Sequence, residues 1–268
     1  MRLSEAQIEQ FTEDGCLFFA RLFSSEEIAA LSAAMRKIMR STPPSAYMEP
    51  SNDAIRMLKG MHLYNETFNR LACHPRLVGP CEQLLGSGVY VHQTRLVPKE
   101  GLKSEAFKGF PWHQDYSTFA RTDGMKEPRA IVNAVFLDEV TACNAPLMTI
   151  PRSHKRGLIT NRSSAPDPNP HVQLVIEPDI IRELVEEGGL TAHVGAAGSV
   201  VMMDVAMVHG STENISPLSR TFCYVIFNSV ENQCVDGLRD EYHACDAIGP
   251  IAPFADDCLL RPISSPQH

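Results

Sequence analysis

The feature that most constrains the fold is a series of short apolar runs that begins after residue 88. Five of them are rich in β-branched and aromatic residues and bounded by Gly, Pro, Asn or Asp: VYVHQTRLVP, RAIVNAVFLDEV, PLMTIP, GSVVMMDVAMVH and RTFCYVIFNSV. Only one convincing helix, PDIIRELVEEGG, lies among them. This order predicts an all-β core, because an alternating β/α fold would place a helical pattern between successive strands.

The first third of the chain has the periodicity of helices. Residues 4–15 begin at Ser4, a common N-cap, and residues 24–41 carry apolar side chains at helical spacing. A further short helix is expected over residues 74–86. We therefore predict one domain over residues 1–268, with a helical N-terminal layer (about 1–87), an all-β core (about 88–245), a polar loop (161–173) and an irregular Pro-containing tail.

The charge balance limits the class of partner. The chain has 32 Asp and Glu against 24 Lys and Arg, for a net charge of −8, which argues against nucleic acid or an anionic membrane as the partner. No apolar run approaches the roughly 20 residues of a membrane span, and the polar start shows no secretory signal. The eight cysteines form no C-x-x-C pair. We expect a cytoplasmic protein with reduced thiols and a small-molecule substrate.

The stretch FPWHQDYSTF places His113 and Asp115 two positions apart. On an extended strand such residues face the same side, so they could form a salt bridge, an acid–base pair or two ligands of a metal. His209, at the end of the apolar run VVMMDVAMVH, would complete a set of two imidazoles and one carboxylate. That set suits Fe(II) and leaves open coordination positions.

Arg220 follows His209 by eleven residues and opens a predicted strand. If the chain turns at NISPLS, the two segments run as adjacent antiparallel strands, and Arg220 points back into the site that His209 borders. A buried guanidinium needs a bidentate anion, which the far carboxylate of a bound 2-oxo acid would supply. Ser211 could donate a further hydrogen bond to it. The alternatives are a surface ion pair for Arg220 and a turn role for Ser211.

Strand alternation adds two expectations. If Arg220 faces inward, the side chains at every second position should face inward with it: Phe222, Tyr224 and Ile226. The alternate side chains should face the other side of the sheet: Thr221, Cys223 and Val225. His92 precedes Gln93 on one predicted strand, so it should face away from Gln93.

With these residues in place, the chain resembles the phytanoyl-CoA dioxygenase family of Fe(II)/2-oxoglutarate oxygenases. The block from YVHQTRL to RSHKRG is especially similar to ectoine hydroxylase and to bacterial hydroxylases of free amino acids. The resemblance implies a double-stranded β-helix, or jelly roll. It also implies iron held by His113, Asp115 and His209, and 2-oxoglutarate held by Arg220 and Ser211.

The resemblance extends to substrate residues. In ectoine hydroxylase the segment that matches YVHQTRL lines the active site, and its Gln and Arg fall on Gln93 and Arg95. We therefore expect Arg95 to contact the cosubstrate, and Gln93, Thr118 and Phe119 to contact the substrate. Val97 departs from that enzyme, which has Asn there.

The activity that the resemblance implies is O₂-dependent hydroxylation of an unactivated C–H bond, with release of succinate and CO₂. The expected substrate is a small, polar, amino-acid-like or ectoine-like metabolite. Two alternatives from the same class remain open: hydroxylation or desaturation of a larger secondary metabolite, or of an acyl-CoA or carrier-bound acyl group. A non-catalytic jelly-roll binding protein is the alternative from another class.

Overall fold

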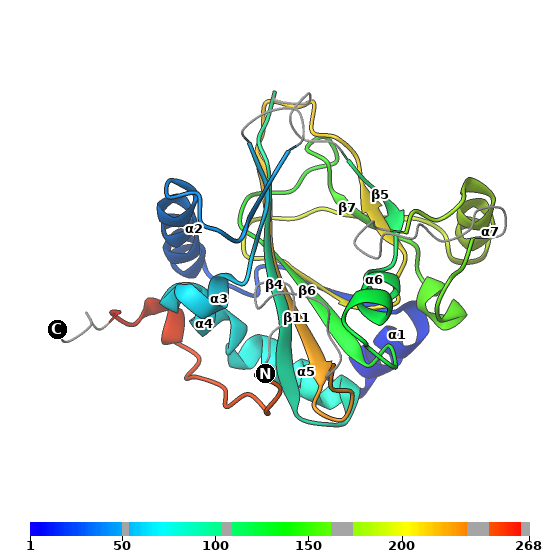
Figure 1. Cartoon of the computed structure of the whole chain (residues 1–268), viewed down its shortest axis with the longest axis horizontal. Helices are drawn as coiled ribbons and strands as arrows, with labels where there is room; N and C mark the ends of the chain where they lie inside the picture. Colours follow the sequence, from blue (N-terminus) through cyan, green and yellow to red (C-terminus); the bar gives the residue numbers. More distant parts are fainter. Residues whose placement is uncertain (50–53, 103–108, 162–173, 235–246, 264–268) are drawn as a thin grey trace.

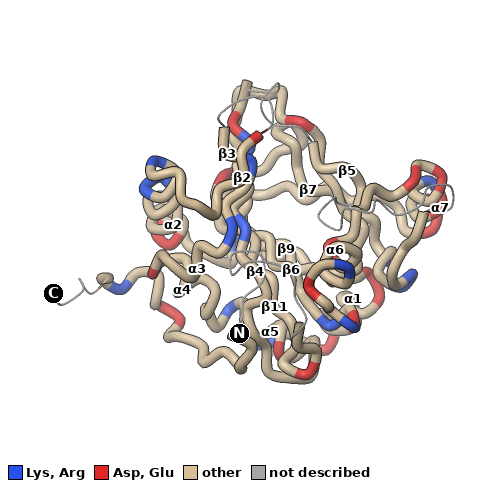
Figure 2. The backbone as a smooth tube through the Cα atoms, viewed as in Figure 1, with Lys and Arg blue, Asp and Glu red and all other residues tan. Residues whose placement is uncertain are grey.

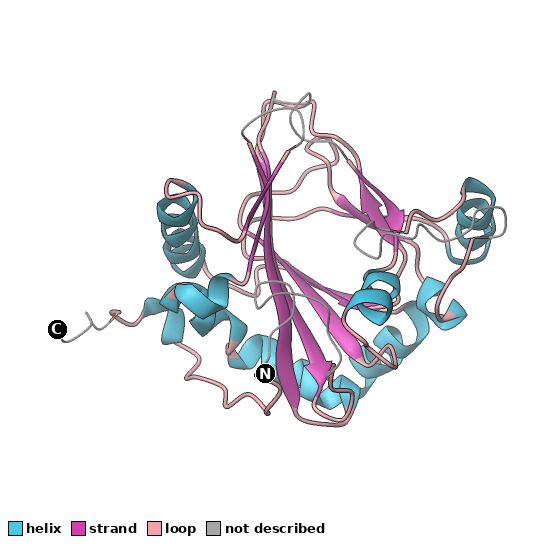
Figure 3. Ribbon diagram, in the orientation of Figure 1, coloured by secondary structure: helices cyan, strands magenta, loops and turns pink. Residues whose placement is uncertain are grey.

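Two antiparallel sheets face each other in a jelly roll, and helices surround them (Figures 1 and 3). The computed structural model describes residues 1–49, 54–102, 109–161, 174–234 and 247–263. Most of the predicted loop, residues 162–173, lies outside these ranges, as does the end of the predicted core. Charged residues lie mainly on the helices and at strand ends, whereas the strands inside the molecule carry few of them (Figure 2).

The larger sheet has seven strands, in the spatial order β1 (Cys16–Phe19), β9 (Val200–Asp204), β6 (Ala130–Phe136), β11 (Arg220–Ser229), β4 (Val89–Lys99), β3 (Ile55–Lys59) and β2 (Ala46–Met48). The smaller sheet has four strands, in the order β5 (Phe110–His113), β10 (His209–Ser211), β7 (Leu147–Thr149) and β8 (Thr191–His193). The predicted all-β core and jelly roll are confirmed.

The helices of the described residues are α1 (Glu5–Asp14), α2 (Ser25–Met39), α3 (Met61–Tyr64), α4 (Glu66–Ala72), α5 (Pro75–Leu85), α6 (Asp115–Thr122) and α7 (Pro178–Gly188), with 3₁₀ turns η1 (Ser153–Arg156) and η2 (Cys258–Leu260). The first helix begins as predicted, because the Ser4 hydroxyl and the Gln7 side chain form a reciprocal capping box. It ends at Gly15, whose φ of 79° few other residues adopt. Within the described residues, no helix has the length and apolarity to cross a membrane.

Strand β11 separates two apolar cores, as its alternation predicts. Phe222 and Ile226 pack into the cluster between the sheets, and Tyr224 packs against that cluster. Cys223 and Val225 pack into the other cluster, which joins the outer face of the sheet to residues of α1, α2, α4 and α5. The helical layer therefore buries one face of the large sheet, and the other face is left for the interior of the jelly roll.

The N-terminal part differs from the sequence prediction in one respect. The segment 46–59 contributes β2 and β3 to the large sheet, so this part of the chain is not only a helical layer. These strands are short, and their register shifts near Met48, which removes the regular alternation that would identify them.

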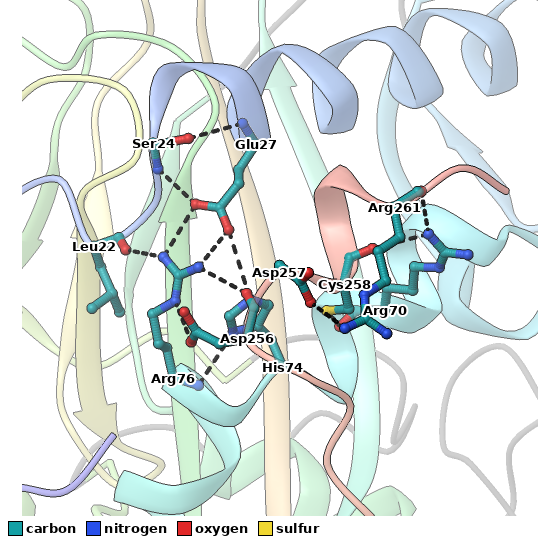
Figure 4. Close-up of polar contacts among 10 residues, drawn as sticks. All are labelled: Leu22, Ser24, Glu27, Arg70, His74, Arg76, Asp256, Asp257, Cys258 and Arg261. Atoms are coloured by element: carbon teal, nitrogen blue, oxygen red, sulfur yellow. Dashed lines mark hydrogen bonds and ion pairs between the residues drawn. The ribbon is translucent and has the colours of Figure 1, made fainter.

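A buried ion pair joins the helical layer to the C-terminal segment (Figure 4). Glu27 of α2 is 2% exposed, and both of its carboxylate oxygens accept hydrogen bonds from Arg76 of α5. Arg76 also donates to the Asp256 carboxylate at 2.9 Å. Nearby, Arg70 of α4 donates to the Cys258 carbonyl at 2.9 Å. The segment around η2 is thus tied to three helices.

Replacing Arg76 by Leu should leave the buried Glu27 carboxylate without its guanidinium partner. We expect the free energy of unfolding to fall by about 3 kcal/mol, measured by urea denaturation. The matched control is Arg156→Leu, because Arg156 pairs with Glu187 where both side chains are about half exposed, and its loss should cost less than about 1 kcal/mol. Equal losses in the two variants would contradict a structural role for the buried pair.

Candidate metal centre

A cavity opens between the two sheets. Its walls come from both: Met57, Arg95, Val97, Phe110, His113, Asp115, Leu147, His209, Gly210, Ser211, Arg220 and Tyr224. Six of the nine residues that the sequence analysis selected lie here, namely His113, Asp115, His209, Arg95, Ser211 and Arg220.

His113, Asp115 and His209 come together at this cavity. His113 of β5 lies directly opposite His209 of β10, and their ring centroids are 4.2 Å apart. Asp115 is the first residue of α6, and one potential ligand atom from each of the three side chains lies within 4.8 Å of the others. All three residues are buried.

Backbone carbonyls fix the tautomer of both imidazoles. Nδ1 of His113 lies 2.6 Å from the carbonyl oxygen of Pro111, and Nδ1 of His209 lies 3.0 Å from that of Met207. A carbonyl oxygen only accepts, so each Nδ1 carries the proton and each Nε2 keeps its lone pair. Two such nitrogens and one carboxylate fit a divalent transition metal of the Fe(II) type.

The protonation states agree with this use. Burial, together with the neighbouring His209, lowers the pKa of His113 to about 3, and burial also lowers the pKa of His209. Burial alone would raise the pKa of Asp115, but Arg95 and the two histidines outweigh it and hold that pKa well below its usual range. At neutral pH the site therefore presents two neutral imidazoles and one carboxylate.

The prediction that His113 and Asp115 share a strand face is wrong. The strand ends at His113, Gln114 caps the next element, and Asp115 lies in the first turn of α6. A carboxylate is favourable there, because the unpaired amides of a helix N-terminus stabilise negative charge. The spacing still brings the two residues together, through a strand-to-helix corner rather than through alternation.

The expected pairing of the His209 and Arg220 segments is also wrong. His209 lies on β10 in the small sheet, whereas Arg220 begins β11 in the large sheet. The intervening chain crosses from one sheet to the other, so the two side chains face each other across the cavity. Both line it, as the sequence predicted.

The Arg220 guanidinium is buried and incompletely satisfied. The residue is 1% exposed, and its Nε donates to the Ala145 carbonyl at 2.9 Å. Its Nη1 and Nη2 are buried and lack hydrogen-bond partners among the described residues. Burial lowers its pKa to about 10, which leaves it charged at neutral pH. Two unsatisfied donors on a buried cation form a binding site for a carboxylate.

Lys99 adjoins this site, although it is not among the described residues that line the cavity, and the sequence patterns did not single it out. It lies opposite Arg220 on β4, is 1% exposed, and donates from Nζ to the Ser211 hydroxyl at 2.9 Å. Burial, with Arg220 and Arg56 nearby, lowers its pKa to about 6. The sequence held a signal that could have pointed to Lys99. It stands at every second position of one strand with Arg95 and Val97, so the three side chains share one face.

Comparison with known proteins gives the family of the chain. The family model of phytanoyl-CoA dioxygenase matches residues 11–222, which is more than half of the chain. The chain belongs to the phytanoyl-CoA dioxygenase family. It is an Fe(II)- and 2-oxoglutarate-dependent dioxygenase.

Several relatives are similar over most of their length. An ectoine dioxygenase from Bordetella bronchiseptica is 37% identical over 86% of this chain and 77% of its own. An L-proline trans-4-hydroxylase from Streptomyces griseoviridis is 31% identical over 93% of this chain and 96% of its own. The crystal structure of EctD from S. alaskensis with 2-oxoglutarate and 5-hydroxyectoine is 30% identical, has a TM-score of 0.79, and covers 91% of this chain and 84% of that one.

Arg95 of this dioxygenase contacts the candidate metal carboxylate. Its Nη1 donates to Oδ1 of Asp115 at 3.1 Å, and its Nη2 donates to Oδ2. The guanidinium also lies 5.5 Å from the Tyr224 ring centroid and 5.8 Å from that of Phe119. This bidentate contact orients Asp115; the predicted contact of Arg95 with the cosubstrate stays a prediction.

The three predicted substrate residues do not line this cavity. Gln93 is 2% exposed on β4, and Thr118 and Phe119 lie on α6. None of them is among the described residues that line the cavity. Their contact with substrate stays a prediction.

We expect His92 to face away from Gln93, but a β-bulge interrupts the alternation on which this expectation rests, so it stays a prediction. The register of β4 against β11 shifts so that Gln93 pairs with Ile226 and Val91 pairs with Phe227, and His92 is the extra residue. Its ring therefore turns toward α6, where it lies 4.5 Å from the ring of Phe119.

Gln114, between the two candidate ligands in sequence, holds their corner in place. It is 1% exposed, and its Nε2 donates to the carbonyls of Gly157 at 2.8 Å and Ala206 at 2.6 Å. Its Oε1 accepts from the amide of Ile159 at 2.9 Å. One amide side chain thus ties the His113–Asp115 corner to the segment before His209.

Gln114→Met should leave two carbonyls and one amide unsatisfied and loosen the corner. We expect the affinity for Fe(II) or Co(II) to fall by roughly 10- to 100-fold, measured by anaerobic titration. Gln83→Met is the control, because Gln83 makes a similar double hydrogen bond to the backbone of Leu3, away from the cavity. Unchanged metal affinity in the Gln114 variant would contradict this role.

Proposed function

We propose that this dioxygenase hydroxylates an unactivated C–H bond of a small, polar, amino-acid-like metabolite, with release of succinate and CO₂. The observation that carries the proposal is the position of one buried, unsatisfied guanidinium across a small cavity from two neutral imidazoles and an ionised carboxylate. A non-catalytic binding protein would not need to keep that combination.

His113, Asp115 and His209 would hold the iron. Their fixed tautomers, low pKa values and mutual distances support this assignment. Bound iron supplies the activation of O₂, coupled to decarboxylation of 2-oxoglutarate. The protein's part would be to bring these three side chains together beside the cavity and to keep Asp115 ionised through Arg95.

Arg220, Lys99 and Ser211 would hold the far carboxylate of 2-oxoglutarate. The Arg220 side chain offers two unsatisfied donors, and the Lys99 ammonium lies within hydrogen-bond distance of the Ser211 hydroxyl. A carboxylate placed there would satisfy the guanidinium and compensate both buried charges.

The lining of the cavity supports a polar substrate, because Arg95, Ser211 and Arg220 all face it. The relatives named as ectoine dioxygenase and L-proline trans-4-hydroxylase act on molecules of this class. We therefore rank amino acids and cyclic amino-acid derivatives above acyl-CoA and larger metabolites, with Gln93, Thr118 and Phe119 as the proposed substrate contacts.

Succinate formation under air tests the proposal. Protein with Fe(II) and 2-oxoglutarate would be offered proline, other amino acids, ectoine and an acyl-CoA. We expect one amino-acid-like compound to raise succinate release and to gain one oxygen atom by mass spectrometry. His113→Ala and His209→Ala should abolish both signals, because each removes one metal ligand. Turnover of the acyl-CoA alone would contradict the substrate class.

Binding of 2-oxoglutarate should take up a proton through Lys99. With a pKa of about 6, the lysine in the empty pocket is mostly neutral at pH 7.5, and a bound carboxylate favours its charged form. We expect uptake of about one proton at that pH, and weaker binding as pH rises further. Calorimetry of the Fe(II)-loaded protein in two buffers with different ionisation enthalpies measures it. Lys99→Met should bind 2-oxoglutarate without taking up a proton, and its affinity for 2-oxoglutarate should be at least roughly tenfold lower. Lys99→Arg, which stays charged, should lose only the uptake.

A further inference from the structure

A second buried ion pair lies behind the wall of the proposed cosubstrate pocket. Arg56 of β3 donates from Nη1 to Oε1 of Glu49 at 2.7 Å, just after β2. The Glu49 side chain is 1% exposed and that of Arg56 is 24% exposed. The second oxygen of Glu49, Oε2, is buried and has no hydrogen-bond partner among the described residues. Its charge is therefore incompletely compensated within the hairpin.

The pair reaches the pocket through an aromatic ring. The Arg56 guanidinium lies 4.3 Å from the ring centroid of Phe110, and Nζ of Lys99 lies 5.3 Å from the same centroid. Phe110 lines the cavity beside Ser211 and Arg220. Two cations thus contact one ring of the pocket wall, and one of them carries its own buried carboxylate.

The charges around Lys99 come from four different segments. Arg220 of β11 and Arg56 of β3 oppose a positive charge on Lys99, whereas Glu213, after β10, and Glu49 favour it. Arg220 belongs to the proposed anion site itself. Glu49 and Arg56 are the opposing pair that lies outside it, and neither is a neighbour of the candidate metal ligands in sequence.

We propose that Glu49 and Arg56 are positioning residues that set the charge of Lys99, and with it the pH range over which the pocket accepts 2-oxoglutarate. This inference rests on the proposed role of Lys99 and Arg220 in cosubstrate binding. Glu49 supports the protonated lysine, and Arg56 limits that support by holding the Glu49 carboxylate on the hairpin.

The two residues act with opposite sign. Glu49→Gln removes a negative charge near Lys99, so Lys99 should lose its proton at lower pH. Arg56→Met removes a positive charge and leaves the Glu49 carboxylate without its partner, so Lys99 should keep its proton to higher pH. Loss of packing alone would not produce opposite shifts, because both substitutions break the same ion pair.

The experiment measures proton uptake on binding of 2-oxoglutarate to the Fe(II)-loaded protein without O₂, from pH 5 to pH 9. We expect the pH at which uptake becomes half-maximal to move down by roughly one unit in Glu49→Gln and up by a similar amount in Arg56→Met. Glu49→Asp and Arg56→Lys keep the charges and serve as matched controls, which should stay close to the wild type. Thermal unfolding of each variant checks that it is folded.

Shifts in the same direction, or no shift in either folded variant, would overturn the inference. Failure of the proposed function is a separate outcome: if Lys99→Met and Arg220→Met both bind 2-oxoglutarate as tightly as the wild type, the pocket itself is misassigned. A third outcome would also overturn the inference. If Lys99→Met takes up a proton over the same pH range as the wild type while the Glu49 and Arg56 variants shift that range, another group takes up the proton.

Discussion

The site depends on two basic side chains that the fold buries next to each other. Arg220 and Lys99 lie opposite each other on neighbouring strands of the large sheet, and each is 1% exposed. Neither has a carboxylate within ion-pair distance among the described residues. Burying two basic side chains together costs free energy through desolvation and charge repulsion. A bound anion compensates that cost in the ligand-bound state. This arrangement supports the proposed carboxylate site for 2-oxoglutarate.

The jelly roll explains why this anion site lies beside the metal site. The two basic side chains come from the large sheet, while His113 and His209 come from paired strands of the small sheet. The two sheets face each other, so one carboxylate end of a ligand can meet Arg220 while its other end approaches the histidines. Asp115 joins from the corner at the start of α6, and Arg95 of the large sheet reaches across to orient it.

Buried polar contacts hold the parts of the centre in register. Gln114 ties the His113–Asp115 corner to the segment that precedes His209, and the capped helices pack against the other face of the large sheet. The hairpin of β2 and β3 adds the Glu49–Arg56 pair to the outer wall of the anion site. The Gln114 contacts join segments that are far apart in the sequence, whereas the Glu49–Arg56 pair is local to its hairpin.

The sequence by itself determined the β-rich core, the first helix and its caps, the alternation of β11, and the identity of the chemistry-bearing residues from His113 to Arg220. These follow from local patterns of two to four residues and from residue types with few alternative uses. Only the tertiary structure decided that Asp115 begins a helix, that His209 and Arg220 lie in opposite sheets, that a bulge falls at His92, and that Lys99 is buried opposite Arg220. The reason is physical: register shifts, corners and sheet crossings depend on contacts between distant segments, and a lysine looks the same in sequence whether it is solvated or buried beside an arginine.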